Sequence, residues 1–114
     1  MTDPNPAVDV ALVEACEAFA RDVLAPQAAR IDAEGLFATL HRPALADLGI
    51  MGLNLPVELG GVGADPFTLF ECIARLSGAC ASTASMFTAH YLATDSIQYG
   101  GDEEQRARFL PDAA

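Results

Sequence analysis

The sequence of 114 residues contains no lysine and no tryptophan, and only 7% of its residues are aromatic. Positive charge is scarce as well, because six arginines stand against sixteen carboxylates and leave a formal net charge of −10. Nucleic-acid binding depends on Lys and Arg displacing counterions from phosphates, so this balance argues against a nucleic-acid partner. Attachment to an anionic membrane surface is disfavoured for the same reason.

Long apolar runs are missing too, since no stretch approaches the ~20 apolar residues that cross a bilayer. Met1–Pro6 has neither the basic residues nor the apolar run of a signal peptide, so we expect a cytoplasmic protein. Cys16, Cys72 and Cys80 form no C-x-x-C motif and lie at no metal-ligand spacing from a histidine. We expect free, buried cysteines in a reducing compartment and no metal site.

Alanine is abundant within a composition that is 52% hydrophobic, which is enough to bury a core. Alanine is the best helix former because fixing it costs no side-chain entropy. We therefore predict an all-α fold, a bundle of about five helices with one Gly-rich loop. Residues 1–114 are expected to form a single helical domain.

Apolar spacing predicts a first helix over residues 7–33, with a kink or a stop just ahead of Pro26. Gly35 is expected to end any helix that resumes after Pro26. A short second helix is predicted over residues 40–48, and Gly49 should supply its left-handed cap.

Residues 50–65 contain Pro56 and the glycine cluster 60–63, which predicts a loop. Asp65 followed by Pro66 predicts a helix start, with a capping carboxylate beside a proline at the first helical position. The helix should end near Gly78. Its expected buried residues are Leu69, Ile73 and Leu76, with Phe70 on the flank.

A fourth helix is predicted over residues 82–99, closed by Gly100 and Gly101. The buried residues expected on it are Met86, Leu92 or Ala93, and Ile97. A fifth helix should open at Asp102, with Gln105 as its capping-box partner, and stop at Pro111.

Few residues in the chain indicate chemistry. The glycine cluster 60–63 could cradle a phosphate, but it lacks the P-loop and G-x-G-x-x-G spacings, which favours a tight loop with positive φ. His41 and His90 have no serine or cysteine at an instructive offset, so packed or surface positions are favoured over catalysis. Glu103 and Glu104 lie in the first turn of a predicted helix, where a solvated role is expected.

Small and hydroxyl side chains follow one another on the fourth predicted helix. They are Ala81, Ser82, Ala84, Ser85, Thr88, Ala89 and Thr94. Such a face lets another helix approach closely, or it forms the wall of an elongated pocket. Spacing does not separate the two, although close packing is the commoner outcome.

Five local motifs occur in one order along the chain. They are F-A-R-D-V-L-A-P with D-A-E-G in residues 19–35, A-D-L-G-I-M-G in 46–52, P-V-E-L-G-G-V-G in 56–63, A-R-L in 74–76 and Y-G-G-D-E-E-Q-R-A-R-F-L-P in 99–111. In this order they resemble the amino-terminal helical domain of the flavin-dependent acyl-CoA dehydrogenases. The A-R-L motif departs from the family's usual E-E-L by the loss of an acid.

The resemblance implies an enzyme that removes two hydrogens across the α,β bond of an acyl-CoA thioester. In the family a carboxylate takes the α proton and N5 of FAD accepts the β hydride. The family fold has this helical domain, a central β-domain and a second helical domain. The chain is thus expected to be the N-terminal portion of a three-domain flavoenzyme, without the β-domain and the C-terminal helical domain. We therefore nominate no catalytic and no cofactor-binding residue here.

The resemblance further implies that the fourth helix forms one wall of the acyl-chain channel. Carried over by position, the substrate-binding residues are Ala84, Thr88 and Leu92. The alanine and the threonine suggest room for bulky or branched acyl groups. The implied partners are acyl-CoA, the remaining domains and, in the complete protein, further copies of itself. A mean hydropathy of +0.27 predicts an exposed apolar patch.

Two other interpretations remain open. One is a free-standing helical interaction module that associates with a dehydrogenase subunit. The other is an unrelated helical bundle whose motif matches are coincidental. Neither interpretation would give these residues turnover of their own.

Overall fold

The computed structural model of the protein describes residues 8–114, except for the side chain of Thr39. The predictions for Met1–Pro6 and Ala7 lie outside the described residues. Every regular element in the described range is helical, so the all-α prediction is confirmed. None of these helices is both long and apolar enough to cross a membrane.

The described chain divides into two compact units. Unit 1 contains the described residues up to Phe37, together with Ala64–Ala84. Unit 2 contains Ala38–Gly63 and Ser85–Ala114. The helix α5, Ala81–Gly100, begins in unit 1 and continues through unit 2.

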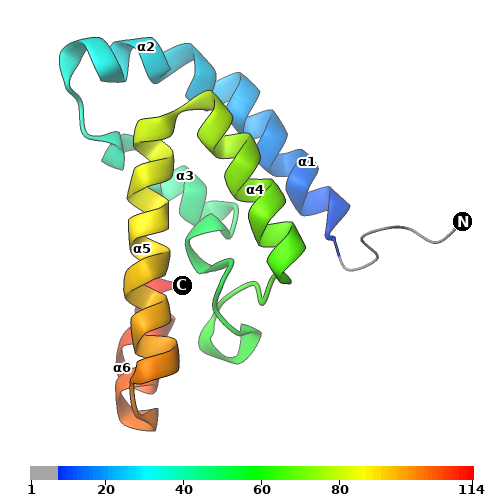
Figure 1. The fold of residues 1–114 in the computed structure, drawn as a ribbon, viewed down its shortest axis with the longest axis vertical. Coiled ribbons are helices and arrows are strands. Elements are labelled where there is room, and N and C mark those ends of the chain that lie inside the picture. Colours follow the sequence, from blue (N-terminus) through cyan, green and yellow to red (C-terminus); the bar gives the residue numbers. More distant parts are fainter. Residues whose placement is uncertain (1–7) are drawn as a thin grey trace, which may run out of the picture. The chain divides into compact units, whose positions relative to one another are not determined.

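Unit 1 opens with one bent helical run in three parts: α1, Val10–Phe19; a π-helical turn, Ala20–Leu24; and α2, Ala25–Glu34. Pro26 lacks an N–H, and in α geometry its ring would meet the carbonyl four residues back. The wider π turn, in which the Ala25 N–H bonds the Ala20 carbonyl, lets the helix continue with the bend seen in Figure 1. The predicted kink is therefore confirmed, and no stop occurs.

The second helix of unit 1 is α4, Pro66–Ala79. Asp65 caps it as predicted, because Oδ1 accepts the N–H groups of Phe67 at 2.9 Å and Thr68 at 3.2 Å. The prediction of its buried face was correct for Leu76 but wrong by one position for the other two residues. Thr68 and Cys72 are fully buried, whereas Leu69 and Ile73 are half-buried. The reason is that α4 turns its smaller side chains toward α1, where they permit close packing.

Unit 2 begins with a 3₁₀ turn, Ala38–His41, that leads into α3, Arg42–Asp47, so the predicted short helix is confirmed. Gly49 follows with a φ of 80°, which confirms the left-handed cap. Two more 3₁₀ turns, Ile50–Gly52 and Val57–Leu59, lie in the predicted loop.

The extent of α5 agrees with the prediction to within one residue at each end, but the predicted buried face was wrong. Leu92 and Ala93 are exposed, while Met86 and Ile97 are half-buried. The buried residues of this helix are Thr83, Ala84, Phe87, Tyr91 and Thr94. Sequence patterns place threonine on polar faces. A threonine hydroxyl can nevertheless donate a hydrogen bond to a carbonyl of its own helix, which allows the side chain to be buried.

The last helix is α6, Glu103–Ala113, and its capping box between Asp102 and Gln105 is confirmed. The prediction that Pro111 stops it was wrong, because Pro111 lies inside the helix. A proline disturbs only the turn before it, and the Ala114 N–H still bonds the Leu110 carbonyl at 3.0 Å. If the bent run from α1 to α2 is taken as one helix, the expected number of five α-helices is reached.

Candidate functional site

The rotation of α5 within unit 2 is fixed by two aromatic residues. Phe87 is fully buried, and its ring centroid lies 5.8 Å from that of Tyr91. The buried Tyr91 hydroxyl donates to the carbonyl of Ile50. Because a buried phenol needs a partner, this bond sets which face of α5 turns away from the core of unit 2.

A second tie joins α5 to the segment that leads into the Gly-rich loop. Nδ2 of Asn54 donates to Thr94 Oγ1 at 3.0 Å and to Asp95 Oδ1 at 2.7 Å. Thr94 Oγ1 also lies 3.0 Å from the carbonyl of His90, one turn back on α5. These bonds and the Tyr91 bond hold the exposed face of α5 in a defined orientation.

The three predicted pocket residues lie at i, i+4 and i+8 on α5. Four residues advance the helix by about 40° more than a full turn, so such a strip drifts around the helix. Ala84 is accordingly buried, Thr88 is half-buried and Leu92 is 73% exposed. Along α5 itself, the strip thus passes from a buried position to an exposed one.

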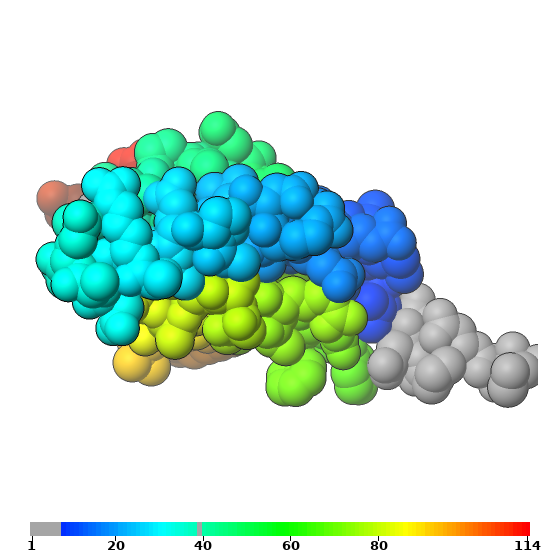
Figure 2. All heavy atoms as spheres, turned by 90° about the horizontal axis from the view of Figure 1, so that it is seen from above, coloured from blue at the N-terminus to red at the C-terminus, as the bar shows by residue number. Residues whose placement is uncertain are grey.

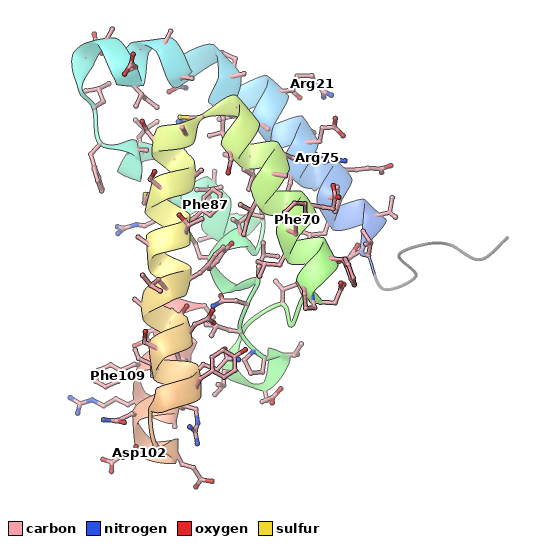
Figure 3. The ribbon with its side chains drawn as sticks, viewed as in Figure 1. Arg21, Phe70, Arg75, Phe87, Asp102 and Phe109 are labelled. Atoms are coloured by element: carbon pink, nitrogen blue, oxygen red, sulfur yellow. The ribbon has the colours of Figure 1, made fainter. Side chains whose placement is uncertain are left out.

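Continued by the same step, the strip reaches Ser96 and Gly100, which line a cleft of about 380 Å³ in unit 2. Asp102 stands at the turn beyond this end of α5, and Phe109, 47% exposed, belongs to α6 (Figure 3). The complete lining is Ser96, Ile97, Gly100, Gly101, Gln105 and Phe109. The cleft therefore has an aromatic wall and a floor of small residues.

Sequence reasoning treated Gly100 and Gly101 only as the end of a helix and so missed the cleft. A Cβ at Gly101 would lie 2.5 Å from the Ile97 carbonyl oxygen, whereas one at Gly100 would meet nothing within 4 Å. One glycine is thus required by the turn, and the other leaves open space. The doubled glycine is the signal in the sequence that could have pointed to the cleft.

The glycine cluster in residues 60–63 forms the predicted tight loop. Gly60 and Gly63 have φ values of 87° and 64°. The amides of residues 60, 61, 62 and 63 all donate to carbonyls of the same loop region, at 2.8 to 3.0 Å. A phosphate cradle needs amides aimed at the anion, so this loop does not fit a phosphate or the pyrophosphate of FAD.

Both histidines occupy structural positions. His41 is buried, and burial lowers its pKa because the charged ring loses its hydration. His90 is half-buried, with Nε2 placed 2.9 Å from the carbonyl oxygen of Ala113. Glu103 and Glu104 are exposed in the first turn of α6, as expected. Over the described range, no three His, Cys, Asp or Glu side chains gather as a metal site would require.

The family described as acyl-CoA dehydrogenase, N-terminal domain, matches residues 8–114, which is the whole described range. The chain belongs to this family. The match includes α5, the Gly-rich loop and α6 with its capping box.

Relatives with established names agree with the family assignment. The chain is 31% identical over 103 residues to the short-chain specific acyl-CoA dehydrogenase, mitochondrial, of Homo sapiens, which covers 88% of this chain and 25% of that protein. Over 100 residues it is 34% identical to the cyclohex-1-ene-1-carbonyl-CoA dehydrogenase of Syntrophus aciditrophicus (strain SB), covering 88% and 24%. The acryloyl-CoA reductase (NADH) of Anaerotignum propionicum is 30% identical over 93 residues, covering 82% and 24%. The chain thus spans about a quarter of the length of these relatives.

Proposed function

We propose that this chain is the N-terminal helical part of a larger FAD-dependent enzyme that dehydrogenates an acyl-CoA thioester across its α,β bond. The family match over residues 8–114 carries the proposal. Its extent, about a quarter of each relative, supports a central β-domain and a second helical domain as the remaining parts. The proposed setting is fatty-acid metabolism in the cytoplasm.

In the proposed enzyme, α5 contributes a wall of the acyl-chain pocket. The proposed substrate-facing strip is Ala84, Thr88 and Leu92. Because Ala84 and Thr88 have small side chains, the wall leaves space for a bulky or branched acyl group. Leu92, 73% exposed, supplies the apolar surface that an acyl chain would cover.

The residues described here do not fit FAD, since the loop amides are used internally and the chain has no lysine for a phosphate. FAD, when bound by the remaining parts of the enzyme, supplies the acceptor for the β hydride. The residues of this chain would hold and orient the acyl group and keep water from it. Purified alone, the chain should therefore be colourless and inactive.

Exposed apolar side chains support further partners. Phe67 and Phe70 on α4 are 57% and 67% exposed, and Tyr99 on α5 is 77% exposed. Monomeric proteins seldom leave large apolar patches uncovered. In the proposed enzyme, these side chains are buried against the remaining domains and against other copies in a homo-oligomer.

Substitution on α5 of the complete enzyme tests this role. Thr88→Leu and Ala84→Leu should lower kcat/KM for branched or long acyl-CoA thioesters relative to butyryl-CoA, by about tenfold or more, because added methylenes fill the pocket. The control is Ala29→Leu, an exposed position on α2 that is not assigned to the wall, and it should leave the ratio unchanged. Unchanged selectivity in both variants, with folding intact by circular dichroism, would contradict the proposal that α5 forms a wall of the acyl-chain pocket.

A second experiment separates an integral domain from a free-standing interaction module. The chain is expressed with its native downstream reading frame and purified by a tag at Met1. A single long polypeptide that is yellow and oxidises acyl-CoA supports the proposal. A 114-residue polypeptide that co-purifies with a separate dehydrogenase subunit would show the module instead.

A further inference from the structure

In unit 1, α1 and α4 run side by side and in the same direction, and both Figure 1 and Figure 2 show them adjacent. Two contacts set the register between them. At the N-terminal ends of both helices, the Asp9 N–H donates to Thr68 Oγ1 at 2.8 Å. Further along, Nε of Arg75 on α4 lies 3.7 Å from the Glu17 carboxylate on α1 (Figure 3 labels Arg75).

Between these two contacts, one cysteine of each helix faces the other. Cys16 of α1 and Cys72 of α4 are both 0% exposed, and both lie where α1 and α4 pack against each other. Each lies on the buried face of its helix, with Val13 on α1 and with Thr68 and Leu76 on α4. The register of the helix pair therefore holds the two sulfur atoms together.

The third cysteine is placed differently. Cys80 follows the last residue of α4 and accepts a hydrogen bond from the Thr83 hydroxyl at 3.3 Å. It thus has a partner other than a thiol, although it is also buried. The chain offers one facing pair of thiols and one separate thiol for comparison.

The contact between the two thiols shifts their pKa values in opposite directions, and the hydrogen bond from Cys16 lowers the pKa of Cys72. The pKa of Cys16 is raised well above its ordinary value by the hydrogen bond with Cys72 and by loss of hydration. The thiolate is the reactive form, so Cys72 is favoured to react first once an oxidant reaches the buried pair. Reaction therefore needs a small oxidant and a brief local opening of α1 from α4.

We propose that Cys16 and Cys72 are a modification site, a dithiol that a peroxide converts to a disulfide joining α1 to α4. One thiol first attacks the peroxide, breaking the O–O bond and giving a sulfenic acid and water. The other thiol then attacks the sulfenic sulfur, forming the S–S bond and releasing a second water. Overall the two sulfurs lose two electrons and two protons, and hydrogen peroxide is reduced to two waters.

The side-chain placement meets the main geometric demand on such a bond. A disulfide needs Cα atoms within about 7 Å and Cβ atoms that point toward each other. Both cysteines lie on the buried faces of two helices that pack against each other, so their side chains enter the same interface. The bond would close the chain between residues 16 and 72 and bring the N-terminal helix and α4 into one covalent loop.

The test uses the purified 114-residue chain treated with hydrogen peroxide under native conditions. The expected product is a monomer lighter by two hydrogens in intact mass. After alkylation and digestion without reductant, the peptides that contain Cys16 and Cys72 should be joined and Cys80 alkylated. The urea midpoint should rise on oxidation and return when the protein is reduced with dithiothreitol.

Cysteine variants assign the reaction. Cys80→Ser should oxidise as the wild type does, while Cys72→Ala should lose the two-hydrogen change. Linkage through Cys80, alkylation of both Cys16 and Cys72 after the longest treatment, or sulfinic acid as the main product would overturn the proposal. Should Cys72→Ala fail to fold, the wild-type peptide map decides alone.

Discussion

Unit 1 is built almost wholly from helix, whereas unit 2 devotes residues 50–63 to turns and to a glycine-rich loop. The long elements of unit 1 meet through buried side chains and two polar contacts, Asp9 to Thr68 and Glu17 to Arg75. Unit 2 depends on placed hydrogen bonds: Tyr91 to Ile50, Asn54 to Thr94, and the amides of residues 60–63. Substitutions at the exposed surface of unit 1 should therefore be tolerated, and substitutions at the packed positions of unit 2 should be costly.

Two phenylalanines give the sharpest test of this contrast. Phe87 of unit 2 is fully buried against Tyr91, while Phe70 of unit 1 is 67% exposed. Phe87→Ala should destabilise the chain by about 4 kcal/mol, from lost transfer energy and the cavity left behind. Phe70→Ala should change stability by no more than about 0.5 kcal/mol, because it is a surface substitution.

Urea denaturation followed by circular dichroism measures both variants. Equal losses would show that Phe70 is covered in solution, for example by a second copy of the chain. A small effect for Phe87→Ala would mean that the Tyr91 bond alone orients α5.

Two glycines compare the backbone of the units. In unit 2, a Cβ at Gly61 would lie 2.2 Å from the Leu55 carbonyl oxygen, so backbone must move to admit it. Gly61→Ala should cost about 3 kcal/mol, the upper range for overpacking. In unit 1, Gly78 lies within α4 with nothing near, and Gly78→Ala should stabilise by about 0.5–1 kcal/mol through helix propensity.

Thermal melts of the two variants should therefore shift in opposite directions. A neutral Gly61→Ala would show that the loop is looser than its hydrogen bonds indicate. Destabilisation by Gly78→Ala would mean that another group contacts α4 at this position in solution.

Caps and breaks of the helices could be predicted from sequence because their chemistry is local. Asp65, Asp102 with Gln105, and Gly49 each act on amides or dihedrals within a few residues. The all-α fold followed from the same local signals and from composition. The prediction that α6 stops at Pro111 was wrong. A proline is expected to break the preceding turn, whereas here the helix includes Pro111.

Helix faces were harder to predict, since they depend on partners distant in sequence. Cys72 faces inward because Cys16 of α1 is small, and Thr94 is buried because its hydroxyl bonds carbonyls of its own helix. The candidate wall could be placed on α5 only through the resemblance. Its gradient of exposure from Ala84 to Leu92 needed the rotation that Tyr91 fixes.

Lowering the pH should reduce the stability of the two units in different pH ranges. These changes in stability should be smaller than those of the substitutions above. Burial lowers the pKa of His41 in unit 2 below its ordinary 6.5. The unfolded chain then binds more protons as pH falls below about 6.5, so stability declines toward the folded pKa. In unit 1, the Thr68 hydroxyl and nearby amides lower the pKa of Asp65 below its ordinary 3.8. That contribution is complete above pH 3.8 and is lost as pH falls through the folded value.

Unfolding midpoints in urea, measured from pH 7 down to pH 3, separate the two groups. His41→Gln should remove the decline that begins just below pH 6.5 and leave the later one. Asp65→Asn keeps a good N-cap but cannot titrate, so it should match the wild type near neutral pH and differ only at the acid end. A wild-type midpoint that stays level from pH 6.5 to pH 4.5 would mean that His41 remains hydrated in solution, and unit 2 would then be more open around α3 than the structure shows.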